Sequence, residues 1–206
     1  MRAEKTEQEK FWESDFGDEY IKRNCDESLV RFNEAFFARL FRHMAKISSV
    51  IEFGANIGLN IMAIRNLLPE IHVDAIETNA TAANRLKEIN DISVHHKSIH
   101  DFTPHRQWDL ALAKTVLIHI PPDMLPAVYD LLYKSSNRYI CIAEYYSTSP
   151  VEVEYRGHRG KLFKRDFAGE MLDRYPDLQL LDYGFLYHRD SFFPHDDINW
   201  FLLERI

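Results

Sequence analysis

Residues that could hold a cofactor gather between Ser48 and Asn60, in the sequence S-S-V-I-E-F-G-A-N-I-G-L-N. Glu52 precedes Gly54 and Gly58, which stand four residues apart. Glycine adopts left-handed backbone angles and lets another molecule approach the backbone closely. A helix that begins after such a turn points N–H groups at its visitor. The stretch therefore predicts a strand, a tight turn and a helix start that bind a nucleotide-like ligand.

Two common phosphate-binding patterns fit this turn poorly. A phosphate-cradling loop needs G-K-[S/T], but Leu59 and Asn60 follow Gly58. The dinucleotide pattern G-x-G-x-x-G would need glycine where Asn56 and Leu59 stand, so two of its three glycines are missing. An acidic residue at position 52 and a second glycine at position 58 remain as the features to explain.

Strand and helix patterns alternate about five times from position 48 to 145, which predicts an α/β fold with a parallel, doubly wound sheet. We expect one domain over residues 1–206. Residues 1–27 form an aromatic-rich N-terminal arm, which either packs on the domain or closes over the site as a helical lid. Residues 146–165 form a polar loop where such sheets place substrate loops.

Composition excludes several classes of protein. The values of 46% hydrophobic and 28% charged residues are those of an ordinary globular chain. A net charge of −7 argues against general nucleic-acid binding. No apolar run approaches the roughly 18 residues that span a bilayer, and the N-terminus lacks the apolar segment of a secretory signal. We therefore expect a cytoplasmic protein that binds neither nucleic acid nor membrane, and composition leaves its oligomeric state open.

The glycine turn resembles the first motif of class I S-adenosylmethionine-dependent methyltransferases, acidic-x-Gly-x-Gly-x-Gly. Glu52, Gly54, Asn56 and Gly58 occupy those places, with Asn56 in place of the middle glycine. Asparagine tolerates left-handed angles better than most residues. The resemblance implies S-adenosylmethionine as cofactor. Glu77, which ends the second predicted strand, would bind its ribose hydroxyls or instead act as a charge partner for the helix that starts near Asn79. By strand order the resemblance also places Ser98 and Ile99 beside the adenine, and Lys114 and Thr115 beside the methionine part.

A likeness over nearly the whole chain is more specific. The runs F-W-x-x-x-F-G-D-E-Y-I-K-R-N, E-F-G-A-N-I-G-L-N, V-L-I-H-I-P-P, Y-R-G-H-x-x-K-L-F-K-R-D-F-A and D-D-I-N-W-F-L-L-E-R resemble the methylases associated with pseudaminic acid biosynthesis. This family implies a Rossmann-like, seven-stranded sheet whose last strand, Ile198 to Glu204, is antiparallel. It does not define the substrate.

The substrate is predicted from a basic segment in an otherwise acidic chain, Tyr155 to Arg165. Arginine binds carboxylate or phosphate in a bidentate manner, which favours an anionic small molecule, although these charges would equally suit a solvated loop. If residues 1–27 form a lid, Tyr20, Arg23 and Asn24 face the same site. The predicted substrate-binding residues are Tyr20, Arg23, Asn24, Tyr155, Arg156, His158 and Arg159.

A general base is needed only if the acceptor arrives protonated. His119, in L-I-H-I, is the first candidate, although a structural role suits it equally, and Glu144 and Tyr145 are the others. His188 to Asp197 is rich in histidine and aspartate, but it lacks helical metal-ligand spacing, so we expect a polar hairpin and no metal.

These features predict a methyltransferase that acts on an oxygen or nitrogen of an acidic sugar or nucleotide sugar. The alternatives are a nucleotide-cofactor oxidoreductase and a catalytically idle binding module of the same fold. Cofactor binding separates the first from the second, and methyl transfer separates the first from the third.

Overall fold

The computed structural model describes residues 4–206, so residues 1–3 of the predicted N-terminal arm lie outside the described residues. The chain falls into two compact units, one that ends at Thr103 and one that begins at Pro104. The expectation of one domain over residues 1–206 stays a prediction. Among residues 4–206, no helix combines the length and the apolar character needed to cross a membrane.

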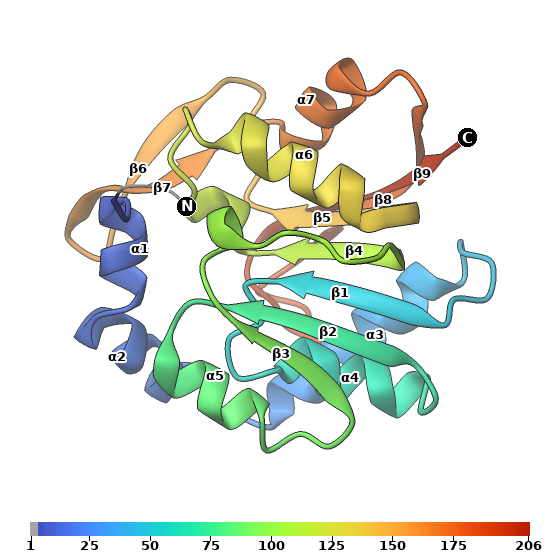
Figure 1. Ribbon diagram of the computed structural model, residues 1–206, viewed down its shortest axis with the longest axis horizontal. Coiled ribbons are helices and arrows are strands. Elements are labelled where there is room, and N and C mark those ends of the chain that lie inside the picture. The colour runs from blue at the N-terminus through green and yellow to red at the C-terminus, as the bar shows by residue number, and fades with distance from the viewer. Residues whose placement is uncertain (1–3) are drawn as a thin grey trace. The chain divides into compact units, whose positions relative to one another are not determined.

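The first unit contains three parallel strands in the order β3-β2-β1 (Figure 1). Helix α5 packs against β2 and β3, α3 packs against α4, and α2 packs against α5. The elements of this unit are α1 (Glu7–Trp12), α2 (Asp15–Arg23), α3 (Ser28–Phe41), β1 (Ser49–Phe53), α4 (Leu59–Leu67), β2 (His72–Glu77), α5 (Ala80–Leu86), β3 (Ile92–His96) and the short helix η1 (Ile99–Asp101).

The second unit contains four strands of the main sheet in the order β4-β5-β9-β8. Helix α6 lies along β4 and β5 (Figure 1), and α7 contacts β5 and β8. The elements of this unit are β4 (Trp108–Lys114), the short helix η2 (Leu117–His119), α6 (Leu125–Ser135), β5 (Ser136–Glu144), β6 (Val151–Tyr155), β7 (His158–Lys164), α7 (Phe167–Arg174), β8 (Leu178–Leu186) and β9 (Ile198–Arg205).

The predicted fold class is confirmed. The main sheet has seven strands, and β9 runs antiparallel to both of its neighbours, β5 and β8. Strands β1, β2, β4 and β5 are nearly continuous runs of buried residues, as expected for parallel strands that are covered on both faces. Within each unit, the carboxyl ends of the parallel strands lie at one edge, which is where open α/β sheets bind ligands.

The segment predicted as a loop over residues 146–165 contains a β-hairpin instead. Strands β6 and β7 pair antiparallel, with Tyr155 opposite His158. The two residues between them, Arg156 (φ 52°) and Gly157 (φ 83°), both have positive φ, as a type I′ hairpin turn requires. Gly157 therefore serves the hairpin turn.

Candidate active site

The glycine turn follows β1 and places three residues in the left-handed region. Gly54 has φ 73°, Asn56 φ 49° and Gly58 φ 86°, which bears out the expectation that Asn56 tolerates this conformation. The N–H groups of Gly54 and Ala55 both donate to the Ile76 carbonyl, at 2.9 and 3.0 Å. Gly58 is the N-cap of α4, so the turn leads directly into the N–H groups of a helix start. The predicted cofactor-binding turn is thus held by backbone bonds to the end of β2.

Glu77, the last residue of β2, is bound to the same turn. Its Oε2 accepts the Asn56 N–H at 2.7 Å, and its Oε1 accepts the Asn79 N–H at 2.7 Å. Burial raises the pKa of this carboxyl, and the N–H groups of Asn79 and Asn56 oppose the rise. Asn79 is the N-cap of α5, so the helix-partner role has a counterpart in the structure. A carboxylate offers about four acceptor positions, and the N–H groups of Asn79, Asn56 and Thr78 do not fill them all, so the ribose role stays a prediction beside it.

The other predicted cofactor residues of the first unit are buried. Glu52 lies inside β1, and its Oε1 accepts a hydrogen bond of 2.6 Å from Asn60 Nδ2 in the first turn of α4. Ser98 and Ile99 are also buried, and Ser98 caps η1 by accepting the His100 N–H at 3.2 Å. Glu52 therefore joins the strand to the helix on either side of the turn. The cofactor contacts of all three residues stay predictions.

The N-terminal helices are attached beside this turn. Asn79 Nδ2 donates to the Trp12 carbonyl at 3.0 Å and to Asp18 Oδ1 at 3.1 Å. Ile21 of α2 is buried in a cluster with Ile57 of the turn and Ala82 of α5. A methyl group at Gly17 would lie 2.0 Å from the Trp12 carbonyl oxygen, so the contact requires glycine. The arm therefore has the apolar anchors that both packing and a lid would need.

The three arm residues predicted to face a substrate make contacts within the arm. The Arg23 guanidinium lies 5.5 Å from the centre of the Phe16 ring. Asn24 Nδ2 donates to the Tyr20 carbonyl at 2.9 Å, and the Tyr20 ring packs edge-on against Trp12. These contacts order the side chains without a ligand, and their substrate role stays a prediction.

In the second unit, Glu144 organises the segment that follows β4. Its Oε1 accepts the N–H groups of Val116 at 2.9 Å and Leu117 at 2.8 Å. Thr115, which follows Lys114, has φ 55°, and its N–H donates to the Ala143 carbonyl at 2.9 Å. The ends of β4 and β5 are therefore held together at the position where the resemblance places Lys114 and Thr115.

Two of the three predicted catalytic side chains have strongly shifted pKa values. Glu144 is 2% exposed, and burial raises the pKa of its carboxyl to about 7. Within residues 4–206, its Oε2 has no hydrogen-bond partner. Burial lowers the pKa of His119 to about 4. Its Nδ1 lies 2.7 Å from the Lys161 carbonyl. A carbonyl only accepts, so the proton is on Nδ1 and the lone pair is on Nε2.

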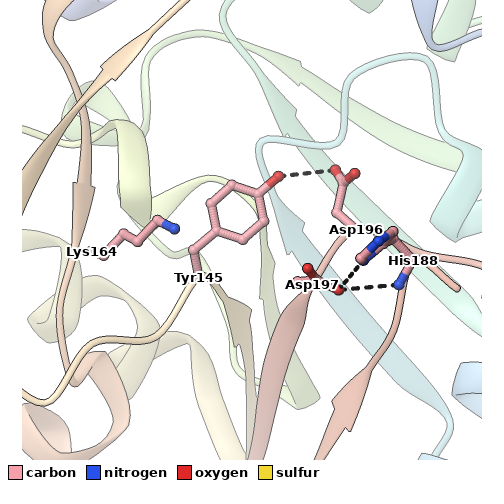
Figure 2. A pocket seen from close by; sticks show the side chains of 5 residues that line it. All are labelled: Tyr145, Lys164, His188, Asp196 and Asp197. Atoms are coloured by element: carbon pink, nitrogen blue, oxygen red, sulfur yellow. Dashed lines mark hydrogen bonds and ion pairs between the residues drawn. The ribbon is translucent and has the colours of Figure 1, made fainter.

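The third candidate, Tyr145, lines an open pocket of ≈ 400 Å³ with Lys164, His188, Asp196 and Asp197 (Figure 2). The Tyr145 hydroxyl donates to Asp196 Oδ2 at 3.0 Å, and Lys164 Nζ lies 5.1 Å from the centre of the Tyr145 ring. Asp197 Oδ1 accepts both the backbone N–H of His188, at 3.1 Å, and its ring Nδ1–H, at 2.8 Å. The bond from the His188 ring is the main cause that lowers the pKa of Asp197. The pocket thus combines a tyrosine, a lysine and a histidine–aspartate pair.

The pocket does not include the predicted substrate residues of the hairpin. Tyr155, Arg156, His158 and Arg159 lie at or beside the β6–β7 turn, and the Arg159 side chain is 88% exposed. Tyr155 packs its ring 5.1 Å from that of His119, and β7 contacts η2. The hairpin therefore covers the segment that carries His119, and its arginines are not among the residues that line the pocket of Figure 2.

Four pocket residues are missing from the sequence-based site: Lys164, His188, Asp196 and Asp197. The last three lie in the stretch that was predicted to be a polar hairpin without a metal. This stretch connects β8 and β9, and among the described residues no group of three or more His, Cys, Asp or Glu side chains is arranged to hold a metal ion. These residues could have been predicted from their position, because the connection follows β8 at the carboxyl edge of the sheet, where open α/β sheets bind ligands.

Comparisons with known proteins place the fold. No protein-family model matches the chain, and no curated protein matches it. Solved structures do match. The 1,6-didemethyltoxoflavin-N1-methyltransferase of Burkholderia thailandensis, with bound substrate and S-adenosylhomocysteine, is 15% identical over 100% of this chain and 93% of its own, with a TM-score of 0.72. The magnesium protoporphyrin IX methyltransferase of Synechocystis PCC 6803, with bound S-adenosylmethionine, is 11% identical over 100% of both chains, with a TM-score of 0.67.

A third match has a different named activity. The plantazolicin methyltransferase BpumL, in complex with S-adenosylhomocysteine, is 14% identical over 96% of this chain and 93% of its own, with a TM-score of 0.67. The three neighbours share a fold at low identity. This chain therefore has the Rossmann-like α/β fold of class I S-adenosylmethionine-dependent methyltransferases.

Proposed function

We propose that this protein is an S-adenosylmethionine-dependent methyltransferase whose acceptor is an oxygen or nitrogen of a small acidic sugar or nucleotide sugar. The observation that carries the proposal is the turn after β1, in which Gly54, Asn56 and Gly58 are all left-handed and Glu77 accepts the Asn56 N–H. At Gly54 such a turn can present its backbone to a ligand with no Cβ in the way, whereas a Cβ at Gly58 would lie 2.6 Å from the Ile89 side chain and 2.9 Å from that of Leu86.

The donor set of the first unit fits the cofactor. Glu77 has acceptor capacity left for a ribose hydroxyl beyond its bonds to backbone N–H groups, and the start of α4 offers N–H groups. When bound, S-adenosylmethionine supplies an electrophilic methyl group on a sulfonium. The bound S-adenosylmethionine and S-adenosylhomocysteine of the structural neighbours support the same cofactor here.

The neighbours do not supply the acceptor, because their named substrates differ from one another. A sugar is favoured by the pocket of the second unit, where Asp196 and Asp197 can accept hydrogen bonds from hydroxyl groups (Figure 2). Its acidic character is favoured by Arg156 and Arg159 on the hairpin and by Lys164 in the pocket. The resemblance to methylases associated with pseudaminic acid biosynthesis selects nonulosonic acids as the first acceptors to try.

Glu144 is the best matched of the three candidate bases. A general base works best when its pKa is near the working pH, and the pKa of Glu144 is about 7 whereas that of His119 is about 4. His119 is neutral at pH 7 and can accept a proton at Nε2, but only weakly. Tyr145 is assigned to positioning the acceptor, because its hydroxyl donates to Asp196. In-line methyl transfer depends mainly on such positioning.

The proposed setting is the cytoplasm, with a small-molecule substrate and without nucleic acid or membrane. Cys25 is exposed and Cys141 buried, and both are free thiols, in keeping with a reducing compartment. The net charge of −7 opposes binding to a phosphate backbone.

Ligand-induced stabilisation tests the cofactor. S-adenosylhomocysteine at about 100 times its Kd should stabilise the fold by about 2.7 kcal/mol, whereas NAD(H) should not change the melting temperature. Stabilisation by NAD(H) alone would favour the oxidoreductase. Labelled S-adenosylmethionine with a panel of nonulosonic acids and their nucleotide sugars tests the transfer, and cofactor binding without transfer to any acceptor would favour the idle module.

Arg156→Ala tests the anionic acceptor. We expect at least about a tenfold rise in acceptor KM, because a charge-assisted bond of about 1.5–3 kcal/mol is lost, with S-adenosylhomocysteine affinity unchanged. Arg85→Ala, which removes an exposed arginine at the end of α5, is the matched control. An unchanged KM in the Arg156 variant would remove the hairpin arginines from the substrate site.

A further inference from the structure

Strand β8 lies at the outer end of the sheet order in the second unit and carries large apolar side chains into solvent. Tyr183 is 64% exposed and Phe185 48%, Leu180 and Leu181 of the same strand are also exposed, and Tyr187, the first residue after the strand, is 44% exposed. We call these five residues the β8 patch. Monomeric proteins seldom leave a contiguous patch of this kind uncovered.

The patch has one continuous side because of the period of a strand. Tyr183 and Phe185 alternate onto the same face of the strand, and the Phe185 ring lies 5.8 Å from that of Tyr187. Tyr183 also stacks on Phe201 of β9 with ring centres 6.4 Å apart. The opposite face is closed, since a methyl group at Gly184 would lie 2.8 Å from the Trp200 ring. The strand is therefore tightly packed on its other face, and its aromatic side chains are exposed on one face only.

The outer edge of β8 also has hydrogen-bonding capacity. Among the described strands, β8 pairs with β9 and forms the end of the sheet order. Its nine residues contain neither lysine nor proline, and Asp182 is the one charged side chain within them. Natural edge strands usually carry lysine, proline or several charged residues, which prevent pairing with another chain. A β-bulge between Leu180 and Asp182 leaves the segment from Asp182 to Leu186 regular.

We propose that the β8 patch is a homodimer interface, in which β8 pairs antiparallel with β8 of a second copy around a two-fold axis. An identical strand is self-complementary in this arrangement. An axis at Tyr183 places Tyr183 opposite its copy, which is a favourable aromatic cross-strand pair, and sets Phe185 of each copy beside the bulge at Leu181 of the other. The same register sets Asp182 opposite Gly184, so the two aspartates do not face each other.

The available area agrees with a second copy as the occupant. Five large side chains of about 200 Å² each, roughly half exposed, offer on the order of 500 Å² of apolar surface per subunit. The backbone of the strand brings the total toward the roughly 800 Å² per partner of a standard interface. The proposal does not depend on the proposed methyl transfer, because no residue of the β8 patch belongs to the glycine turn or to the pocket of Figure 2.

Sedimentation velocity and chemical cross-linking test the interface. We expect the wild-type chain to be a dimer at micromolar concentrations and Tyr183→Arg to be a monomer with an unchanged melting temperature, because Tyr183 is mostly exposed. Leu67→Arg, at another exposed apolar residue on α4, should remain dimeric. A wild-type monomer throughout, or a mass that keeps rising above that of a dimer, would overturn the proposal.

The register has its own test, which also holds if the arginine variant folds poorly. In a Cys25→Ser background, Tyr183→Cys should give a disulfide-linked dimer under mild oxidation, because directly opposed antiparallel residues have Cα atoms about 4.5–5.5 Å apart, within disulfide range. Leu67→Cys in the same background is the control. Equal cross-linking of the two variants would mean random collision and would overturn the β8 interface.

Discussion

The glycine turn of the first unit and the pocket of the second unit are built from different parts of the chain. The turn is held by backbone: two N–H groups on the Ile76 carbonyl and one on Glu77. The pocket is built from side chains of three separate segments, with hydrogen bonds from Tyr145 to Asp196 and from His188 to Asp197 (Figure 2). A site held by backbone hydrogen bonds is sensitive to changes in backbone conformation but tolerates many side-chain substitutions. A site made of side chains is sensitive to substitution of those side chains. A general cofactor and a particular acceptor would need these two properties.

The largest effect is expected where a side chain is forced into the turn. Gly54 has φ 73°, a region that costs a β-branched residue well over 1 kcal/mol, and under the proposed function the cofactor approaches its backbone. Gly54→Val should weaken S-adenosylhomocysteine binding at least about 1,000-fold, or about 4 kcal/mol, by isothermal titration calorimetry. Circular dichroism checks the fold. Tight binding by a folded valine variant would place the cofactor elsewhere.

The second effect concerns Glu144 and the pH dependence of stability. An unfolded glutamate loses its proton near 4.5, whereas the pKa of folded Glu144 is about 7. Glu144 therefore makes its full contribution to the free energy of unfolding below pH 4.5, and this contribution is lost as the pH rises through 7. Glu144→Gln cannot ionise and should be more stable than wild type by about 3 kcal/mol well above pH 7, with no difference near pH 4.

Urea unfolding at several pH values measures this difference, with the exposed Glu88→Gln as control. His119 contributes with the opposite sign. Its folded pKa of about 4 lies below the ordinary 6.5, so its stability contribution is complete above 6.5 and is lost as the pH falls toward 4. A glutamine variant whose stability parallels wild type at every pH would show that Glu144 is ionised at low cost, and Glu144 would then be a poor base.

The same contrast explains what could be predicted from the sequence. The strand ends, the turn at 54–58 and Glu77 follow from contiguous patterns, because a left-handed turn between a strand and a helix is a local property. The pocket is not local, since Tyr145 and its partner Asp196 are 51 residues apart, and His188 and Asp197 meet only across the β8–β9 connection. The hairpin at 151–164 was missed because Arg156 occupies a turn position that asparagine or glycine usually fills.

A third and smaller effect is expected where the N-terminal arm is attached. Asn79→Ala removes the acceptor of the Ala82 N–H and the donor to the Trp12 carbonyl. Loss of a cap and of a buried hydrogen bond should lower the stability by about 1–2 kcal/mol. It should also speed tryptic cleavage at Lys22 and Arg23 in α2.

The matched control is Asn84→Ala on the exposed side of the same helix, where Asn84 accepts a long hydrogen bond of 3.4 Å from Lys87. Protection of the Lys22 and Arg23 sites by S-adenosylhomocysteine in wild type, and its absence in the Asn79 variant, would support a lid that closes over the cofactor. Equal cleavage with and without the ligand would leave the arm as a packing element of the first unit.

The smallest effect should come from the residue that departs from the methyltransferase motif. Asn56 lies at φ 49° and contributes its backbone N–H to Glu77, and a glycine at this position keeps that N–H. Glycine removes left-handed strain of about 1 kcal/mol but adds unfolded-chain entropy of about 0.4–1 kcal/mol, so the two nearly cancel. Asn56→Gly should therefore bind S-adenosylhomocysteine within about threefold of wild type by calorimetry, whereas Asn56→Val should bind it poorly. A large loss with glycine would mean that the asparagine side chain contacts the ligand, and the turn would then select its ligand by side chain as well as by backbone.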